Sequence, residues 1–300
     1  MQKLIVILGP TAVGKTKFAV QLANNFNGEI ISADSRQVYI SMDIGTGKDI
    51  DEYKINEKII PYHLIDVVNP TDEYDLFSFQ KDFYNTISQI KDDNTLPFLT
   101  GGTGLYIHSI LMNYKLNEVD FNSSRAKFLA NINEEELKII LNKLKPIQHN
   151  MTDITNKSRI IKAILIAENK SKANLPDFNF DTLVIGISEN RDIVKTRITK
   201  RLKYRLENGM IEEVEKLILN GISYERLDSF GLEYKFIGKY LNGEFTYNDM
   251  FQKLNSAIHQ FSKRQMTWFR KMEKEGILIN WMKFSEIEKA NLLVSNFLNN

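Results

Sequence analysis

Residues 9–16 read Gly9-Pro10-Thr11-Ala12-Val13-Gly14-Lys15-Thr16, which fits the phosphate-binding pattern G-x-x-x-x-G-K-[ST]. An apolar run of strand length, residues 4–8, precedes this loop, and residues 18–23 after it have the composition of a helix. A strand, a glycine-rich loop and a helix in this order form the context that such a loop requires. The stretch therefore predicts a P-loop NTPase-like α/β fold, in which a parallel sheet forms the core.

The chemistry of this loop predicts that it binds a diphosphate or a triphosphate. Glycines allow backbone N–H groups to turn toward an anion, and the N-terminus of the following helix adds a favourable dipole. Lys15 contributes a positive charge, and the hydroxyl of Thr16 can hold Mg²⁺. A purely structural glycine turn is the alternative, but it does not require the lysine and the threonine that are both present. The loop alone does not identify its phosphate ligand.

Composition describes an ordinary globular chain of one large domain or two modest ones. It has 300 residues, 43% hydrophobic and 26% charged, with a net charge of +1 and no cysteine. The balanced charge gives no overall field for nucleic acid, and the lack of cysteine excludes disulfides and thiolate metal sites. No signal peptide is evident, and no apolar stretch approaches the ~20 residues of a membrane span. We expect a cytoplasmic enzyme, and nothing in the sequence argues for more than a monomer.

Strand-like and helix-like segments alternate over the first part of the chain, which predicts a parallel sheet with helices on both faces. Glycine is then absent from residue 117 until Gly186, and the sequence there favours helices. The predicted strands are 4–8, 29–32, 62–68, 96–100 and 182–187, and the predicted helices begin at 18, 77, 134 and 158. We expect a core of residues 1–115 and 182–300, interrupted by a helical insertion at 116–181, with a helical C-terminal third.

Two polar segments follow predicted strands at the sheet edge where ligands bind in open α/β folds. Asp34, after the second strand, can take a proton from a nucleophile or orient Mg²⁺, whereas a helix cap is an equally supported alternative. Residues 100–106, Thr-Gly-Gly-Thr-Gly-Leu-Tyr, form a second glycine-rich turn, for which a tight structural turn is the alternative. A nucleoside-triphosphate hydrolase usually ends such a strand in aspartate. Here the predicted strand 96–100 is followed by glycines, and the nearest substitute is Asp66. The lack of an aspartate at the end of this strand argues against a hydrolase.

Basic residues concentrate in two segments. Seven lysines and arginines lie between residues 191 and 205, and Trp268 and Phe269 separate four others between 263 and 271. Arginine suits phosphate oxygens, and basic residues mixed with aromatic ones suit single-stranded nucleic acid. A solvated helix face is the alternative for both segments. The net charge of +1 supports that alternative for the first segment more than for the second.

Taken together and in order, these segments closely resemble the tRNA dimethylallyltransferase family, also called delta(2)-isopentenylpyrophosphate transferases. The resemblance covers nearly the whole chain and rests on residues 9–16, 32–39, 45–48, 62–66, 101–106 and 262–270. Family members transfer a dimethylallyl group from dimethylallyl diphosphate to the exocyclic amine of the adenosine 3′ of the anticodon, favouring tRNAs that read codons beginning with U. Such a reaction cleaves no γ-phosphate, which accounts for the missing hydrolase aspartate.

The resemblance implies a role for each matching residue. The donor's diphosphate would lie in the glycine loop, against Gly9, Thr11, Ala12, Val13, Gly14, Lys15 and Thr16, with Mg²⁺ on the Thr16 side. Asp34 matches the family's proposed general base, and the helical insertion corresponds to the part that grips the anticodon stem-loop. Contacts with tRNA are implied for Asp34, Ser35, Arg36, Gln37, Thr103, Arg125, Arg159, Lys162, Lys263, Arg264 and Gln265.

The chain departs from the family pattern at a few positions. Many members carry a diphosphate-contacting arginine in a segment ending Gly-Tyr-Arg, and residues 227–235 contain no clear counterpart. Lys235, Arg191 and Arg197 are the alternatives for that cation. His259 and Ser158 stand where an arginine and a glutamine are common. These departures concern the phosphate contacts, and the resemblance as a whole is unaffected.

Two other functions compete with the prenyltransferase. A kinase for a small molecule or nucleoside would bind ATP in the glycine loop and use Asp34 to activate a hydroxyl. The missing strand-end aspartate and the basic segment at 263–270 argue against it. A catalytically inactive RNA-binding protein is the other alternative, and the intact glycine loop with Asp34 argues against that.

Overall fold

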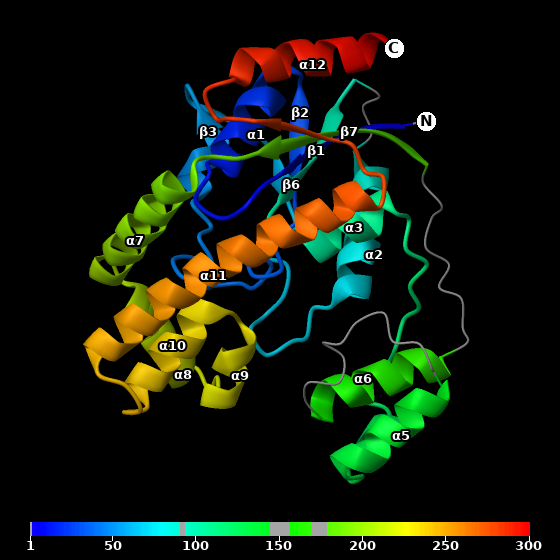
Figure 1. Cartoon of the computed structure of the whole chain (residues 1–300), viewed down its shortest axis with the longest axis vertical. Coiled ribbons are helices and arrows are strands. Elements are labelled where there is room, and N and C mark those ends of the chain that lie inside the picture. Colours follow the sequence, from blue (N-terminus) through cyan, green and yellow to red (C-terminus); the bar gives the residue numbers. More distant parts are fainter. Residues whose placement is uncertain (1, 91–93, 145–156, 170–178) are drawn as a thin grey trace. The chain divides into compact units, whose positions relative to one another are not determined.

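The computed structural model describes residues 2–90, 94–144, 157–169 and 179–300. Two compact units divide the chain between them. The larger unit combines residues 1–112 with 177–300, and the smaller one spans residues 113–176 (Figure 1). The smaller unit thus interrupts the larger one in sequence, and each is described by itself.

The larger unit is built on a parallel sheet with the strand order β5-β2-β6-β1-β7-β8. Its strands are β1 (Gln2–Leu8), β2 (Gly28–Ser32), β5 (Tyr62–His63), β6 (Leu96–Gly101), β7 (Phe180–Ile187) and β8 (Ile279–Met282). In β1, Ile5 pairs with Phe98 on one side and Leu183 on the other. Residues 4–8 are completely buried, as expected for a central parallel strand covered on both faces. The predicted α/β class with a parallel core is confirmed.

The larger unit also contains helices, and their order in the chain is shown by colour in Figure 1. They are α1 (Lys15–Asn25), α2 (Leu76–Gln89), α3 (Gly104–Leu111), α7 (Arg191–Glu207), α8 (Met210–Leu219), α9 (Tyr224–Ser229), α10 (Leu232–Leu241), α11 (Tyr247–Lys274) and α12 (Ile287–Asn299). A 3₁₀ turn (Ile50–Tyr53) and a small hairpin of β3 (Lys54–Ile55) and β4 (Lys58–Ile59) complete the unit. Helix α11 begins with a capping box between Thr246 and Asp249 and packs against α3, α7 and α10.

The smaller unit has a hydrophobic core of its own. Its described helices are α4 (Ser124–Ala130), α5 (Glu134–Leu144) and α6 (Lys157–Glu168). Leu129, Leu137, Ile160 and Ile164 are fully buried between them. All three helices fall within the predicted insertion, whose expected end at residue 181 lies inside β7.

Within the parallel sheet, the structure differs from the prediction at two strands, and the hairpin of β3 and β4 was not predicted either. The run 62–68 was predicted as one strand, but β5 stops at His63, since Leu64 and Asp66 have φ values of 61° and 55°. Strand β8 at the sheet edge was not predicted, because four residues after a long helix carry little periodic signal. In the part of the chain that the structure describes, no helix is long and apolar enough to cross a membrane.

Candidate functional site

The glycine loop connects the carboxyl end of β1 to the first turn of α1. Gly9 has φ 156°, and a Cβ there would lie 2.4 Å from the carbonyl oxygen of Ile187 in β7. Gly14 has φ 91° immediately before Lys15 begins α1. Both positions therefore need glycine, one for close backbone approach and one for a left-handed conformation. The loop thus leads into a helix N-terminus, an arrangement that favours anions.

Two cations next to this loop lack a carboxylate partner. Lys15 Nζ donates to the carbonyl of Pro10 at 2.8 Å, and the guanidinium of Arg201 in α7 donates to the Thr11 hydroxyl. Burial lowers the pKa of Lys15 to about 8, although the nearby Asp34 carboxylate opposes this shift. Burial also lowers the pKa of Arg201 to about 10. Neither forms an ion pair within the described residues, so an anion between them would stabilise both charges.

Asp34 lies in a turn after β2 and not at a helix start. Its Oδ1 accepts the Arg36 backbone N–H at 2.9 Å, and this hydrogen bond forms a local turn. No helix follows this turn at residues 35–40. The alternative interpretation of Asp34 as a helix cap is therefore wrong. Its electrostatic effect on Lys15 shows that the carboxylate lies near the phosphate-binding loop.

The second glycine-rich loop, residues 101–104, packs directly on the Asp34 segment. The Ser35 N–H donates to the Thr103 hydroxyl at 3.1 Å, and the Thr103 N–H donates to the Ala33 carbonyl at 3.2 Å. A Cβ on Gly101 would lie 2.1 Å from that same carbonyl oxygen, so only glycine fits. The fold thus brings Thr103 and Ser35 together, as the strand-end argument expects.

Gln37 is held by hydrogen bonds at both ends of its side chain. Its Nε2 donates to the Gly47 carbonyl at 3.0 Å, and its Oε1 accepts from the Ser32 hydroxyl at 3.1 Å. A carbonyl accepts only, which fixes the amide orientation. Among the described residues, these two bonds leave one N–H and one lone pair of the amide for a further partner.

Asp66, the sequence candidate for a strand-end aspartate, has another role. It accepts a hydrogen bond from Lys48, whose fully buried side chain also contacts Asp43 at 2.9 Å and the Tyr39 carbonyl at 2.5 Å. Asp66 is thus part of an ion-pair cluster that holds the loop after β2. No group of three or more histidine or acidic side chains in the described ranges can hold a metal ion.

Gln265 of α11 does not lie on the surface. It is 8% exposed, its Oε1 accepts the Thr11 N–H at 2.8 Å, and its Nε2 donates to the Gly102 carbonyl at 2.9 Å. Its neighbours Lys263 and Arg264 are exposed. The three residues of this predicted tRNA-contacting motif therefore separate into two exposed cations and one buried bridge.

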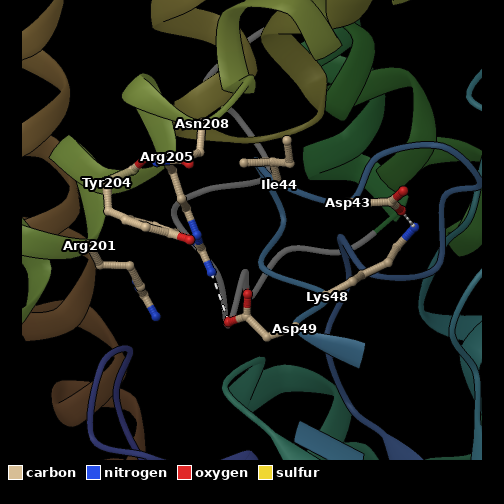
Figure 2. A pocket seen from close by; sticks show the side chains of 8 residues that line it. All are labelled: Asp43, Ile44, Lys48, Asp49, Arg201, Tyr204, Arg205 and Asn208. Atoms are coloured by element: carbon tan, nitrogen blue, oxygen red, sulfur yellow. Dashed lines mark hydrogen bonds and ion pairs between the residues drawn. The ribbon is translucent and has the colours of Figure 1, made fainter. Parts of the chain in front are cut away.

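A cavity of about 430 Å³ opens beside Arg201. It is lined by Asp43, Ile44, Lys48, Asp49, Arg201, Tyr204, Arg205 and Asn208 (Figure 2). In this view Arg205 extends toward Asp49, with which it forms a 3.0 Å ion pair, and no interaction is drawn for Arg201. Arg205 is therefore neutralised by Asp49, whereas the guanidinium of Arg201 donates to the Thr11 hydroxyl in the glycine loop.

The other cations considered for the diphosphate pair elsewhere or are exposed. Arg197 lies 3.7 Å from Glu189, and Lys235 lies 3.1 Å from Asp228, whereas Arg191 is exposed at the start of α7. Arg201, which donates to Thr11 in the glycine loop, was not among these alternatives. The spacing of 197, 201 and 205 puts them on one helix face, but only the tertiary structure shows which one reaches the loop.

The remaining predicted site residues lie in the smaller unit. Arg125 forms a two-pronged pair with Glu168, with N···O distances of 3.0 and 2.6 Å. Lys162 Nζ lies 4.9 Å from the centre of the Phe121 ring, and Arg159 is exposed on α6. Their tRNA roles stay predictions.

Comparisons with known proteins agree with each other. A family described as IPP transferase matches residues 37–272, and one described as isopentenyl transferase matches residues 2–59. A tRNA dimethylallyltransferase of Geotalea uraniireducens is 50% identical over 281 residues, which cover 93% of this chain and 92% of the relative. One from Bacteroides fragilis is 48% identical over 285 residues, covering 94% and 93%.

Solved structures give the same result. A tRNA isopentenylpyrophosphate transferase of Bacillus halodurans superimposes with a TM-score of 0.72 and 30% identity, covering 100% of this chain and 97% of the other. A eukaryotic dimethylallyltransferase acting on tRNA has a TM-score of 0.71 at 24% identity, covering 94% and 74%, and shows the shared fold.

Proposed function

The chain belongs to the IPP transferase family, and we propose that it acts as a tRNA dimethylallyltransferase. It transfers a dimethylallyl group from dimethylallyl diphosphate to the exocyclic N6 amine of an adenosine in tRNA, and releases diphosphate. The finer parts of this proposal are the modified position, which is 3′ of the anticodon, and the choice of tRNAs that read codons beginning with U. They rest on the sequence resemblance.

One observation carries the proposal at the level of the site. Lys15 and Arg201, both without a carboxylate partner among the described residues, face one glycine loop, and Asp34 lies within electrostatic reach of that loop. Such an arrangement suits an anionic leaving group on one side and a proton acceptor on the other. The reaction proposed here requires both.

The residues present also fit Mg²⁺. This ion usually binds one or two protein oxygens together with substrate phosphates and several waters, and does not need a cage of carboxylates. The hydroxyl of Thr16, in the first turn of α1, supplies such an oxygen next to the loop. When bound, Mg²⁺ would neutralise charge on the departing diphosphate.

The chain's own residues supply the remaining steps. The amine nitrogen forms a bond to the allylic carbon while the bond from that carbon to the diphosphate oxygen breaks. Lys15 and Arg201 stabilise the negative charge that develops on the diphosphate. An adenine amine is barely acidic, so Asp34 accepts its proton during the attack and not before it. The target base must leave its stack to reach a site at the sheet edge.

A kinase that binds ATP in the loop fits less well. Strand β6 ends in Gly101, and Asp66 is engaged by Lys48, so neither supplies the aspartate that usually holds Mg²⁺ in such enzymes. The named relatives are tRNA dimethylallyltransferases. The kinase is therefore not favoured.

The proposal is tested by direct transfer. The protein is incubated with Mg²⁺, labelled dimethylallyl diphosphate and an anticodon stem-loop bearing adenosine 3′ of the anticodon. We expect label in the RNA, and none when guanosine replaces that adenosine. Absence of label in the adenosine substrate, together with ATP-dependent phosphorylation of a small acceptor, would overturn it.

A further inference from the structure

Helix α11 carries a buried glutamine that contacts both glycine-rich loops of the site. Gln265 accepts the Thr11 N–H through Oε1 and donates to the Gly102 carbonyl through Nε2, at 2.8 and 2.9 Å. Its partners are 254 and 163 residues away in the chain. One amide therefore bridges the loop after β1 and the loop after β6, two strands that already pair at Leu8 and Gly101, and satisfies two backbone groups that would be costly to leave unpaired.

The contact with Gly102 leads on to Asp34. Thr103, the next residue, accepts the Ser35 N–H through its hydroxyl and donates its own N–H to the Ala33 carbonyl. These bonds flank Asp34 on both sides. A connected path of hydrogen bonds and peptide links therefore runs from the glycine loop, through Gln265, to the segment that holds Asp34.

Trp268, one turn further along α11, supports the same loop. A Cβ on Gly104 would lie 2.2 Å from Trp268 Cδ1, so the indole rests against the backbone where α3 begins. Residues three apart lie on one helix face, so Gln265 and Trp268 act on residues 102–104 together. This face of α11 is occupied by the protein, in contrast to the exposed Lys263 and Arg264.

We infer that Gln265 is a positioning residue that sets the distance between the donor's diphosphate and Asp34, by tying the glycine loop to residues 102–104. The inference rests on the proposed function, which puts the donor in the glycine loop and makes Asp34 the proton acceptor. Displacing reacting groups by about 1 Å can cost about 10²-fold in rate. Loss of Gln265 therefore slows the chemical step, while each substrate still meets its own contacts.

Kinetics of two variants test this. Gln265→Leu removes both hydrogen bonds at similar volume, and Gln265→Glu keeps the acceptor for Thr11 but replaces the donor to Gly102 with an oxygen. We expect the single-turnover transfer rate to fall about 10- to 100-fold in both. The KM values for dimethylallyl diphosphate and the stem-loop should stay within about threefold. The matched control is Gln252→Leu, the same change at an exposed position of α11.

If Gln265 had only a structural role, the kinetics of the variants would differ from this expectation. The substitutions would lower the fraction of active molecules but leave the single-turnover rate constant of the folded ones unchanged. Wild-type rate constants in both variants, or a rise in KM with no loss of rate, would overturn the inference. The near-isosteric Gln265→Glu keeps this test available if Gln265→Leu does not fold.

A second readout does not depend on transfer. Hydrogen exchange of the peptide containing residues 101–104 is measured with and without inorganic pyrophosphate and Mg²⁺. We expect pyrophosphate in the glycine loop to slow exchange in that peptide in the wild type and in Gln252→Leu, and to have no effect in Gln265→Glu. Equal protection in Gln265→Glu would overturn the inference even if no transfer occurred in the wild type. Absence of transfer with this coupling intact would instead overturn the proposed function alone.

Discussion

In the proposed reaction, Asp34 is the residue that accepts the proton. In Asp34→Asn the side-chain oxygen can still accept the Arg36 N–H, so the turn is preserved while the basic group is lost. We expect kcat to fall by about 10² to 10⁴-fold, the usual contribution of a positioned base. Affinity for the stem-loop, measured by filter binding, should stay within a few-fold. Unchanged turnover would remove Asp34 from the base role.

The lowered pKa of Lys15 predicts pH-dependent anion binding. Burial holds this pKa at about 8 in the free protein, so Lys15 is largely charged at pH 7 and loses its proton as the pH rises through 8. The Kd for inorganic pyrophosphate should therefore increase between pH 7 and 9, with proton uptake on binding at the higher pH. Lys15→Arg, which keeps its charge throughout, corrects for the titration of pyrophosphate itself. Parallel pH curves for the two proteins would contradict this assignment.

Some site residues were predictable because their signal is local. The glycines, Lys15 and Thr16 occur within eight positions, and Asp34 directly follows a strand. Arg201 was not distinguished from Arg197, because equal helical spacing says nothing about which residue faces the loop. Gln265 was predicted as an RNA contact, since a Lys-Arg-Gln sequence does not reveal that the third side chain turns inward.

At the level of elements, a single carboxylate on α8 holds the loop that follows β2. Glu213 accepts the backbone N–H groups of Asp43, Ile44 and Gly45 at 2.7, 2.7 and 3.0 Å, and the Tyr234 hydroxyl at 2.7 Å. Burial and this carboxylate raise the pKa of Tyr234 well above its usual value. The loop held in this way ends at Gly47, whose carbonyl orients Gln37.

Glu213→Gln tests the strength of this arrangement. The amide presents N–H where the carboxylate accepts, so at least one buried donor loses its partner. We expect a loss of about 1–3 kcal/mol in the free energy of unfolding, measured by urea denaturation. Glu215→Gln, the same change at an exposed position of α8, should stay within about 0.5 kcal/mol. Equal stability of the two variants would show that the loop does not depend on Glu213.

Some helices and strands were predictable from local sequence, whereas the ends of others depend on tertiary contacts. Strand β1 and helix α1 were predicted because a buried apolar run and a glycine loop are visible in sequence. The third strand was predicted too long, because its apolar run does not reveal the positive φ values of Leu64 and Asp66, and β5 ends at His63. In the folded chain Asp66 accepts a hydrogen bond from Lys48, a tertiary contact that the local sequence does not show.

For the whole molecule, a net charge of +1 means that RNA affinity must come from local groups of cations. The predicted tRNA-contacting cations occur in both units. Lys263 is exposed on α11, and Arg159 is exposed on α6. If each of these two residues contacts a phosphate, removing either one removes one contact. The salt dependence of binding counts such contacts, since each contributes about 0.7 to 0.9 to the slope of log K against log salt.

We therefore expect Lys263→Ala and Arg159→Ala each to lower the salt slope for stem-loop binding by about 0.7 to 0.9, and the double variant to lower it by the sum. Lys289→Ala serves as the control, because Lys289 is an exposed lysine of α12 that is not among the predicted tRNA contacts. Binding is measured by fluorescence anisotropy over a range of KCl concentrations. A double variant that matches Lys263→Ala alone would show that the smaller unit makes no phosphate contact through Arg159. Additive slopes would mean that Lys263 and Arg159 each contribute their own phosphate contact to RNA binding.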